Sequence, residues 1–152
     1  MFDRFFHINI CVSDMDRAIA FYTALGFDVA EDVHVEGTDV APHLGITVRE
    51  LRAVILTCPG TSSPMIDLVQ LIDPPAATGP YPRLDNLGAA RISFWTDDVD
   101  RVLAHLAEHG IETFGPDVRY PSPTNEQLRT VVFRDPDGTA LQVIGSGLEV
   151  AS

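Results

Sequence analysis

An internal repeat at a spacing of 84 residues constrains the fold of this chain more than any other feature of its sequence. Shifted by 84 positions, residues 7–17 (HINICVSDMDR) fall on residues 91–101 (RISFWTDDVDR), and Gly26 falls on Gly110. Both copies also show the same order of local sequence patterns, which a chance similarity would not produce. The sequence therefore predicts two modules of the same architecture.

Each copy begins with a pattern typical of a strand followed by a helix. Residues 7–12 and 91–95 alternate apolar side chains with polar or aromatic ones, which is the period of a strand with two different faces. Apolar residues at helical spacing come next in both copies. They are Met15, Ala18, Ile19, Tyr22 and Leu25 in the first copy, and Val99, Val102, Leu103 and Leu106 in the second.

Polar residues and glycines mark both ends of these two helices. Ser13 and Asp97 are predicted as the N-caps, with Asp16 and Asp100 three residues later in an arrangement close to a capping box. The two glycines that the repeat aligns stand where a helix needs a left-handed residue to end. The helices are therefore expected to begin and end at equivalent positions in the two modules.

Three further strand patterns follow each helix, so each module is predicted as βαβββ. The tetrapeptide DPDG at residues 135–138 is expected to form a tight turn between the last two strands. The fold class is α+β, with tandem modules forming a curled, eight-stranded mixed sheet, a cup, flanked by helices. The predicted strands are residues 27–30, 51–58, 65–71, 111–114, 130–133 and 139–144; the modules are residues 1–73 and 89–147, joined by a linker rich in proline, residues 74–88.

The charge of the chain excludes several classes of partner. There are 22 acidic against 10 basic side chains, a net charge of −12, which repels nucleic-acid phosphates and anionic membranes. No apolar run approaches the roughly 20 residues of a membrane-spanning helix, and the start of the chain lacks the layout of a secretion signal. The chain has two cysteines, Cys11 and Cys58, which are too few for a disulfide scaffold. We therefore expect a cytoplasmic location.

The segments HINICVSDMDRAIAFYTALGF and VVFRDPDGTALQVI, placed in a tandem βαβββ repeat, resemble the vicinal oxygen chelate superfamily. This group includes glyoxalase I, methylmalonyl-CoA epimerase, extradiol dioxygenases, and fosfomycin-resistance and bleomycin-binding proteins. The resemblance covers nearly the whole chain and implies a single glyoxalase/bleomycin-resistance-like domain over residues 1–152. It also implies a small-molecule substrate or ligand and a homodimer, while many reactions occur on this fold.

In the metal-using members, ligands come from the first and fourth strands of each module, which the resemblance carries over to His7, Asp67, Arg91 and Gln142. Arginine stays protonated, has no lone pair to offer and repels a nearby cation. An ion pair between Arg91 and Asp67 is therefore expected in place of the metal. We expect either no cofactor or a divalent metal held by the other three residues, His7, Asp67 and Gln142.

Other polar and aromatic residues remain open to two interpretations. Asn9, Ser93 and Trp95 are expected on the inner face, where they would bind substrate or simply pack. His7 is also compatible with an ordinary buried histidine, and Asp67 with a purely structural ion pair. The i, i+4 pair His105 and His109 is interpreted as solvated helix residues, and His34 and His43 are unassigned. Cys11 is expected to face the cup. Residues 31–50 and 114–127 are long connections and therefore candidate lids.

Two functional hypotheses follow. The first is a lyase- or isomerase-type enzyme that moves a proton on a small carbonyl or carboxylate compound. Arg91 would stabilise the developing oxyanion, His7 or Asp67 would act as the base, and Gln142 would complete the catalytic set. The second is a metal-free protein that binds and sequesters a small antibiotic, with Trp95 stacking on a cationic or aromatic ligand. An interaction module without a ligand is disfavoured, because it leaves Asp67 and Arg91 without a role beyond pairing.

Overall fold

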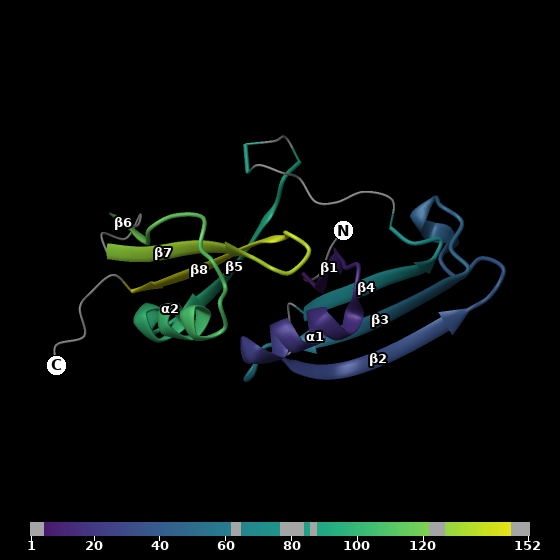
Figure 1. Cartoon of the computed structure of the whole chain (residues 1–152), viewed down its shortest axis with the longest axis horizontal. Helices are drawn as coiled ribbons and strands as arrows, with labels where there is room; N and C mark the ends of the chain where they lie inside the picture. The colour runs from purple at the N-terminus through teal and green to yellow at the C-terminus, as the bar shows by residue number, and fades with distance from the viewer. Residues whose placement is uncertain (1–4, 62–64, 77–83, 86–87, 122–126, 147–152) are drawn as a thin grey trace. The chain divides into compact units, whose positions relative to one another are not determined.

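The computed structural model describes residues 5–61, 65–76, 84–85, 88–121 and 127–146. The chain divides into two compact units, Met1–Gly79 and Pro80–Ser152, each with its own sheet and its own long helix (Figure 1). The predicted α+β architecture of tandem βαβββ modules is confirmed, with the eight strands in two mixed sheets of four.

The first unit forms a sheet in the order β1-β4-β3-β2. Strand β1 is parallel to β4, whereas β3 is antiparallel to both of its neighbours. The elements are β1 (His7–Cys11), α1 (Met15–Ala24), β2 (Asp28–Glu36), a short 3-10 helix (Pro42–Leu44), β3 (Glu50–Thr57) and β4 (Met65–Asp73).

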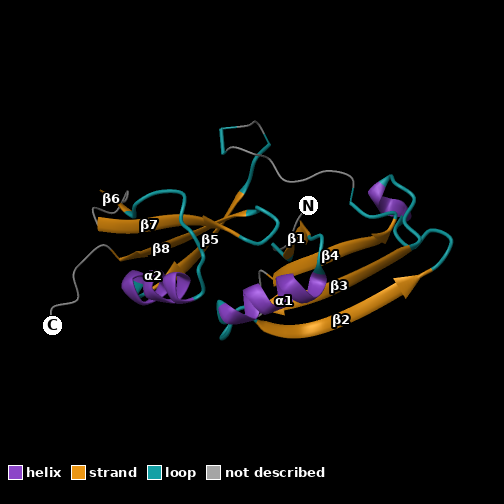
Figure 2. Cartoon of the chain, viewed as in Figure 1, coloured by secondary structure: helices purple, strands orange, loops and turns teal. Residues whose placement is uncertain are grey.

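The second unit repeats this topology in the order β5-β8-β7-β6 (Figure 2). Its first strand is again parallel to its last, and the other pairs are antiparallel. The elements are β5 (Arg91–Thr96), α2 (Val99–Glu108), β6 (Val118–Pro121), β7 (Gln127–Arg134) and β8 (Ala140–Ser146). Neither helix, in the ranges given above, is long and apolar enough to cross a membrane.

One face of each sheet packs against the helix of its own unit. The apolar stripe of each helix predicted from the sequence supplies that contact, and burying such side chains stabilises the fold by about 1.5–3 kcal/mol each. The opposite face of each sheet carries both polar and apolar side chains, such as Asp67 and Val69 in β4 and Gln142 and Ile144 in β8. Fully or almost fully buried residues include Met15, Tyr22, Leu56 and Leu68 in the first unit, and Leu106, Val131, Phe133 and Leu141 in the second.

The predicted N-caps Ser13 and Asp97 are wrong by one residue. The caps are Asp14 and Asp98, whose carboxylates accept from the backbone amides of the third helical residues at 3.0 and 2.8 Å. Both predicted caps bond elsewhere instead. The Ser13 hydroxyl accepts from the guanidinium of Arg17, and the Asp97 carboxylate accepts from the Trp95 indole.

The two second strands also differ from the prediction. Strand β2 continues to Glu36, well into the predicted lid. The prediction ended this strand too early because a solvent-exposed edge strand carries little apolar pattern. In the second unit residues 111–114 form no strand; Thr113 makes one isolated bridge to Phe133, and Pro116 separates it from β6. The predicted helix ends and the DPDG turn are confirmed: Gly26, Gly110 and Gly138 have positive φ, and Asp135 Oδ1 accepts two backbone amides of its turn.

Candidate functional site

Three of the predicted site residues meet on the sheet face of the first unit that is turned away from α1. The parallel register sets Asn9 beside Asp67, and alternation along β1 puts His7 on the same face. The Asn9 side-chain amide donates to Asp67 Oδ2 at 2.6 Å, and its oxygen lies 3.1 Å from His7 Nε2. His7 Nε2 is itself 4.0 Å from the same Asp67 oxygen. The three form one connected cluster.

The hydrogen bonds in this cluster determine which atoms donate. An ionised carboxylate only accepts, so the NH2 group of Asn9 must face Asp67 and its oxygen must face His7. Since that oxygen also only accepts, His7 carries a proton on Nε2. In the neutral imidazole the acceptor is then Nδ1.

Two atoms of the cluster remain unsatisfied. Asp67 Oδ1 and His7 Nδ1 are buried and have no hydrogen-bond partner among the residues that the structure describes. Burial raises the pKa of Asp67 above its ordinary value, and the neighbouring His7 and Asn9 oppose this effect only in part. A carboxylate that is costly to keep ionised and has one oxygen without a partner is suited to accept a proton.

The second unit places a neutral pair at the equivalent position. Ser93 pairs with Gln142 in the β5–β8 register, and its hydroxyl donates to Gln142 Oε1 at 2.9 Å. Gln142 Nε2 donates to Thr130 Oγ1 at 2.7 Å, and the Thr130 hydroxyl donates to the Val143 carbonyl at 2.8 Å. Sequence reasoning missed Thr130, because nothing in the pattern of β7 shows which polar residue on the next strand bonds Gln142.

Arg91 and Trp95 lie on the same face of β5 as Ser93, one toward each end of the strand. Both are exposed, Trp95 at 61% of its surface. The Trp95 indole donates to Asp97 Oδ1 at 2.9 Å, which fixes the direction of the ring. The second unit therefore presents a cation and an oriented aromatic ring on one strand. The predicted ion pair between Arg91 and Asp67 joins residues of different units and stays a prediction.

The residues present do not fit the four-ligand metal site that the family resemblance implies. The first unit does supply a nitrogen and a carboxylate oxygen that have no partner in the part of the chain that the structure describes, His7 Nδ1 and Asp67 Oδ1. At the two matching positions of the second unit, Arg91 has no lone pair, and the Gln142 oxygen already accepts from Ser93. No catalytic step is therefore derived through a metal at these positions.

Each unit contains an arginine that sequence reasoning did not single out. In each unit this arginine lies on the third strand of the module. It donates to two aspartates, one in the first turn of the unit's helix and one on or next to the edge strand of its sheet. The network thus ties helix and sheet edge together in the same way twice. The residues are Arg52 with Asp16 and Asp32, and Arg129 with Asp100 and Asp117.

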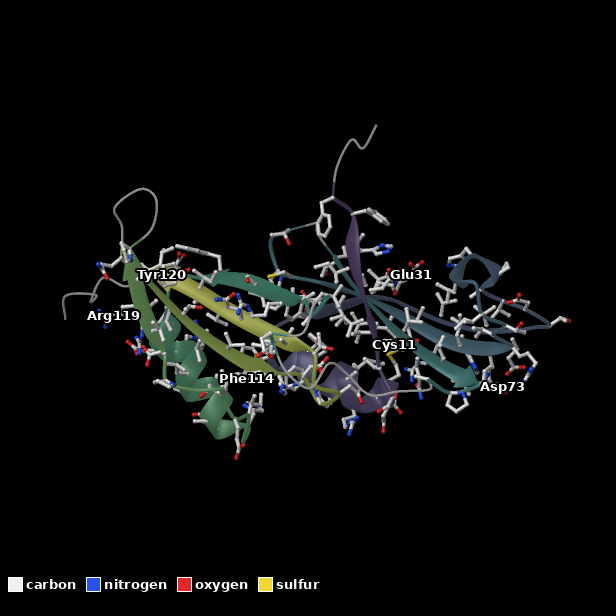
Figure 3. The ribbon with its side chains drawn as sticks, turned by 90° about the horizontal axis from the view of Figure 1, so that it is seen from above. Cys11, Glu31, Asp73, Phe114, Arg119 and Tyr120 are labelled. Carbon is white, nitrogen blue, oxygen red and sulfur yellow. The ribbon has the colours of Figure 1, made fainter. Side chains whose placement is uncertain are left out.

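The remaining predicted residues lie outside these clusters. His34 Nε2 is 2.9 Å from Glu50 Oε1 between β2 and β3, and the Cys11 thiol is exposed at the end of β1 (Figure 3). Phe114, in the second predicted lid, lies under the guanidinium of Arg134 at 4.3 Å. Residues 122–126 of that lid lie outside the described part of the chain, and the lid role of both segments stays a prediction.

Comparison with known proteins agrees with this fold. A family model described as the Glyoxalase/Bleomycin resistance protein/Dioxygenase superfamily matches residues 4–143. A glyoxalase family protein from Bacillus cereus is similar in structure, with a TM-score of 0.84, 23% identity, and coverage of 96% of this chain and 95% of that one. No curated protein shows significant sequence similarity to the chain.

Two further solved structures are similar, and their proteins have different functions. The trypanothione-dependent glyoxalase I of Leishmania major has a TM-score of 0.64 at 22% identity, with 94% of this chain and 86% of that one covered. TnmS3, an antibiotic binding protein from Streptomyces sp. CB03234, has a TM-score of 0.62 at 24% identity, with 96% and 98% covered. At these identities the likeness shows the fold alone.

Proposed function

Because the chain belongs to the glyoxalase/bleomycin resistance protein/dioxygenase superfamily, we propose that it is an enzyme that transfers a proton on a small carbonyl or carboxylate compound. The observation that carries the proposal is the Asp67 carboxylate. Asn9 holds one of its oxygens, burial raises its pKa, and its other oxygen has no partner among the described residues. The reaction is of the isomerase or lyase type, with a degenerate metal site.

Asp67 is the proposed base. Its Oδ1 accepts the proton from a carbon next to the carbonyl group, and the C–H electron pair moves toward the carbonyl oxygen to give an enolate. The protonated Asp67 then returns the proton to the substrate, which completes an isomerisation. His7 is the alternative base, through its Nδ1 atom, which also has no partner among the described residues. When Asp67 is the base, His7 and Asn9 position its carboxylate.

Arg91 is the proposed electrophile. A guanidinium donates two parallel hydrogen bonds to an enolate or carboxylate oxygen and holds a permanent positive charge. Its assignment rests on this chemistry and on its place in the repeat, at the position equivalent to His7. The substrate is also proposed to contact three residues of the paired strands β5 and β8, namely Ser93, Trp95 and Gln142.

Proton exchange tests the enzyme proposal directly. The protein in D2O is incubated with pyruvate, 2-oxobutyrate or dihydroxyacetone, and loss of the C–H signal next to the carbonyl is followed by NMR. We expect catalysed exchange, slowed about 10²–10⁴-fold in Asp67→Asn and about 10²–10³-fold in Arg91→Ala. Thr23→Ala, on the exposed surface of α1, is the control. Exchange at the wild-type rate in Asp67→Asn shows that Asp67 is not the base.

Capture of an antibiotic is the second candidate function. Trp95 is exposed and oriented by Asp97, the chain carries a net charge of −12, and TnmS3 is an antibiotic binding protein of the same fold. Trp95 is the sole tryptophan, so its fluorescence reports a stacked ligand. Stoichiometric quenching by bleomycin, lost in Trp95→Ala and without chemical change of the ligand, favours this candidate. No quenching at a twofold molar excess argues against it.

The proposed oligomer is a homodimer. This proposal comes from the family. Size-exclusion chromatography with light scattering measures the mass directly, and a mass of one chain across the accessible concentration range excludes the dimer.

A further inference from the structure

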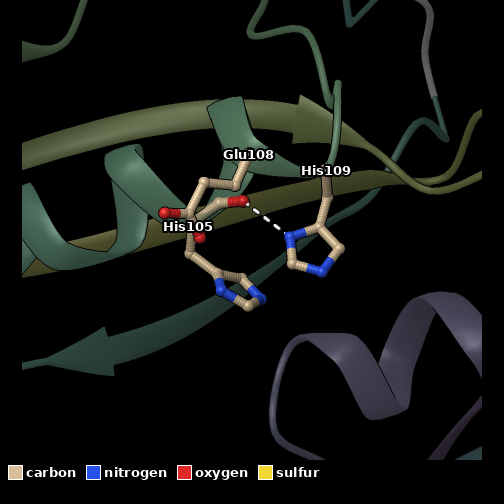
Figure 4. Close-up of side chains that lie close together, drawn as sticks. All are labelled: His105, Glu108 and His109. Carbon is tan, nitrogen blue, oxygen red and sulfur yellow. Dashed lines mark hydrogen bonds between the residues drawn. The ribbon is translucent and has the colours of Figure 1, made fainter.

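The last turn of α2 brings together three side chains of the types that bind transition metals. Glu108 and His109 follow His105 by three and four residues, and each of these spacings brings a side chain next to that of His105 at the end of the helix. Each offers a ligand atom, and these atoms all lie within 4.8 Å of one another (Figure 4). The two imidazole rings are 4.2 Å apart between centroids. None of these residues belongs to the clusters around Asp67 or Gln142.

One of the two imidazoles is already oriented for metal binding. His109 Nδ1 lies 2.9 Å from the backbone carbonyl of His105. A carbonyl only accepts, so Nδ1 carries the proton, and Nε2 keeps its lone pair in the neutral ring. Metal-ligating histidines commonly donate their other nitrogen to a backbone carbonyl, which fixes the tautomer and the ring direction.

The electrostatic surroundings favour a cation. His109 is the C-cap of α2, where the carbonyl groups of the helix give a partial negative charge. Glu108 adds a full negative charge beside both rings, and the whole chain has a net charge of −12. A divalent cation at this end of α2 is therefore attracted by the Glu108 carboxylate, by the carbonyl groups at the end of the helix and by the net negative charge of the chain.

The internal repeat shows that the fold does not require these residues. At the equivalent positions of the first module stand Phe21, Ala24 and Leu25, and α1 still ends at the same place before a left-handed glycine. The packing of a module thus accepts apolar residues at all three positions. The two histidines and the glutamate of the second module are not explained by the needs of helix α2.

We propose that His105, Glu108 and His109 form a surface site for a divalent transition metal, of which Zn²⁺ is the best match. Imidazole nitrogen and carboxylate oxygen are ordinary zinc ligands, and three protein ligands leave a coordination position for water or another molecule. The presence of two imidazoles favours zinc, nickel, cobalt or copper over magnesium and calcium. The site is carried by one helix of the second unit and is independent of the proposed proton-transfer function.

Zinc titration against a chromophoric chelator tests the proposal. The variants His105→Phe and His109→Leu carry the residues that the first module has at the same places, so the helix is expected to persist. Each is expected to weaken zinc binding at least about tenfold, and Glu108→Ala to weaken it as well. The matched control is His34→Ala, which removes the imidazole from the other His/Glu cluster, His34, Glu36 and Glu50. It is expected to bind zinc as the wild type does.

Thermal unfolding gives a second readout. Zinc at 100 times its dissociation constant stabilises the native state, so the Tm of the wild type is expected to rise on adding zinc and the Tm of the His105→Phe/His109→Leu double variant is not. Far-UV circular dichroism without metal verifies that the variants are folded. The proposal is overturned if the double variant retains wild-type zinc affinity, or if His34→Ala abolishes binding instead.

Discussion

The Asn9 amide donates to Asp67 Oδ2 at 2.6 Å across the parallel β1–β4 pair, between residues 58 positions apart in the chain. In the second unit the Ser93 hydroxyl donates to Gln142 Oε1 at 2.9 Å at the same place in the topology. The repeat has therefore kept the geometry of this pair while its chemistry is charged in one unit and neutral in the other. In the proposed function this difference assigns the proton transfer to the first unit.

Replacing Asn9 by alanine tests its hold on the carboxylate. Without the donor, the half-buried Asp67 carboxylate loses its hydrogen bond from Asn9, so we expect the Asp67 pKa to rise further and the free energy of unfolding to fall by about 1 kcal/mol. A carbon NMR titration and urea unfolding measure the two effects. Ser93→Ala removes the equivalent neutral bond and is expected to leave the Asp67 pKa unchanged. An Asp67 pKa that does not move in Asn9→Ala contradicts this role.

The stability of the protein is expected to depend on pH through Asp67. Burial raises its folded pKa above the ordinary value of 3.8, so the native state holds the proton more tightly than the unfolded chain does. The stabilising contribution of Asp67 is complete below that value and is lost as pH rises through the raised pKa. The stability of Asp67→Asn relative to the wild type should therefore increase from about pH 3 to pH 7. Urea unfolding over this range measures it, and a constant or falling difference contradicts the prediction.

The two arginine networks should contribute unequally to stability. The side chain of Arg129 is 15% exposed and that of Arg52 is 27% exposed, and each bonds two aspartates. We expect Arg129→Met to cost about 1 kcal/mol of unfolding free energy and Arg52→Met a smaller amount, because water screens the ion pairs of the less exposed guanidinium less. Unfolding in low and in high salt separates the charge effect. Equal losses that do not change with salt would falsify this explanation.

Gly145 in β8 should not tolerate a side chain. A Cβ at this position would lie 2.5 Å from the Thr96 carbonyl oxygen and 2.6 Å from Val99 Cγ2, where β5 passes into α2. Gly145→Ala is expected to lower the free energy of unfolding by about 1–3 kcal/mol through this overpacking. Gly115→Ala meets nothing within 4 Å and is the matched control. Thermal melts of both variants suffice, and similar melting temperatures argue against the close approach.

Local patterns predicted most of the elements. The strands and helices that bury one face, such as β4 and α1, carry a clear period and were found within two or three residues of their ends. The exceptions are β2 and β6, edge strands whose residues are largely exposed, so apolar periodicity does not mark them. The N-caps were missed by one residue because Ser13 and Asp14, like Asp97 and Asp98, are both good capping residues and the local sequence does not distinguish them.

The sequence by itself determined the two modules and their βαβββ order, because these follow from short-range periodicity and from the repeat. Its resemblance to the family indicated which residues stand at the positions of that family's metal ligands. Only the tertiary structure decided what those residues bond to. Asn9 is the partner of Asp67, and Thr130 is a partner of Gln142, because sheet register brings distant strands together. Register depends on how whole faces pack, and no local pattern in a single strand contains that information.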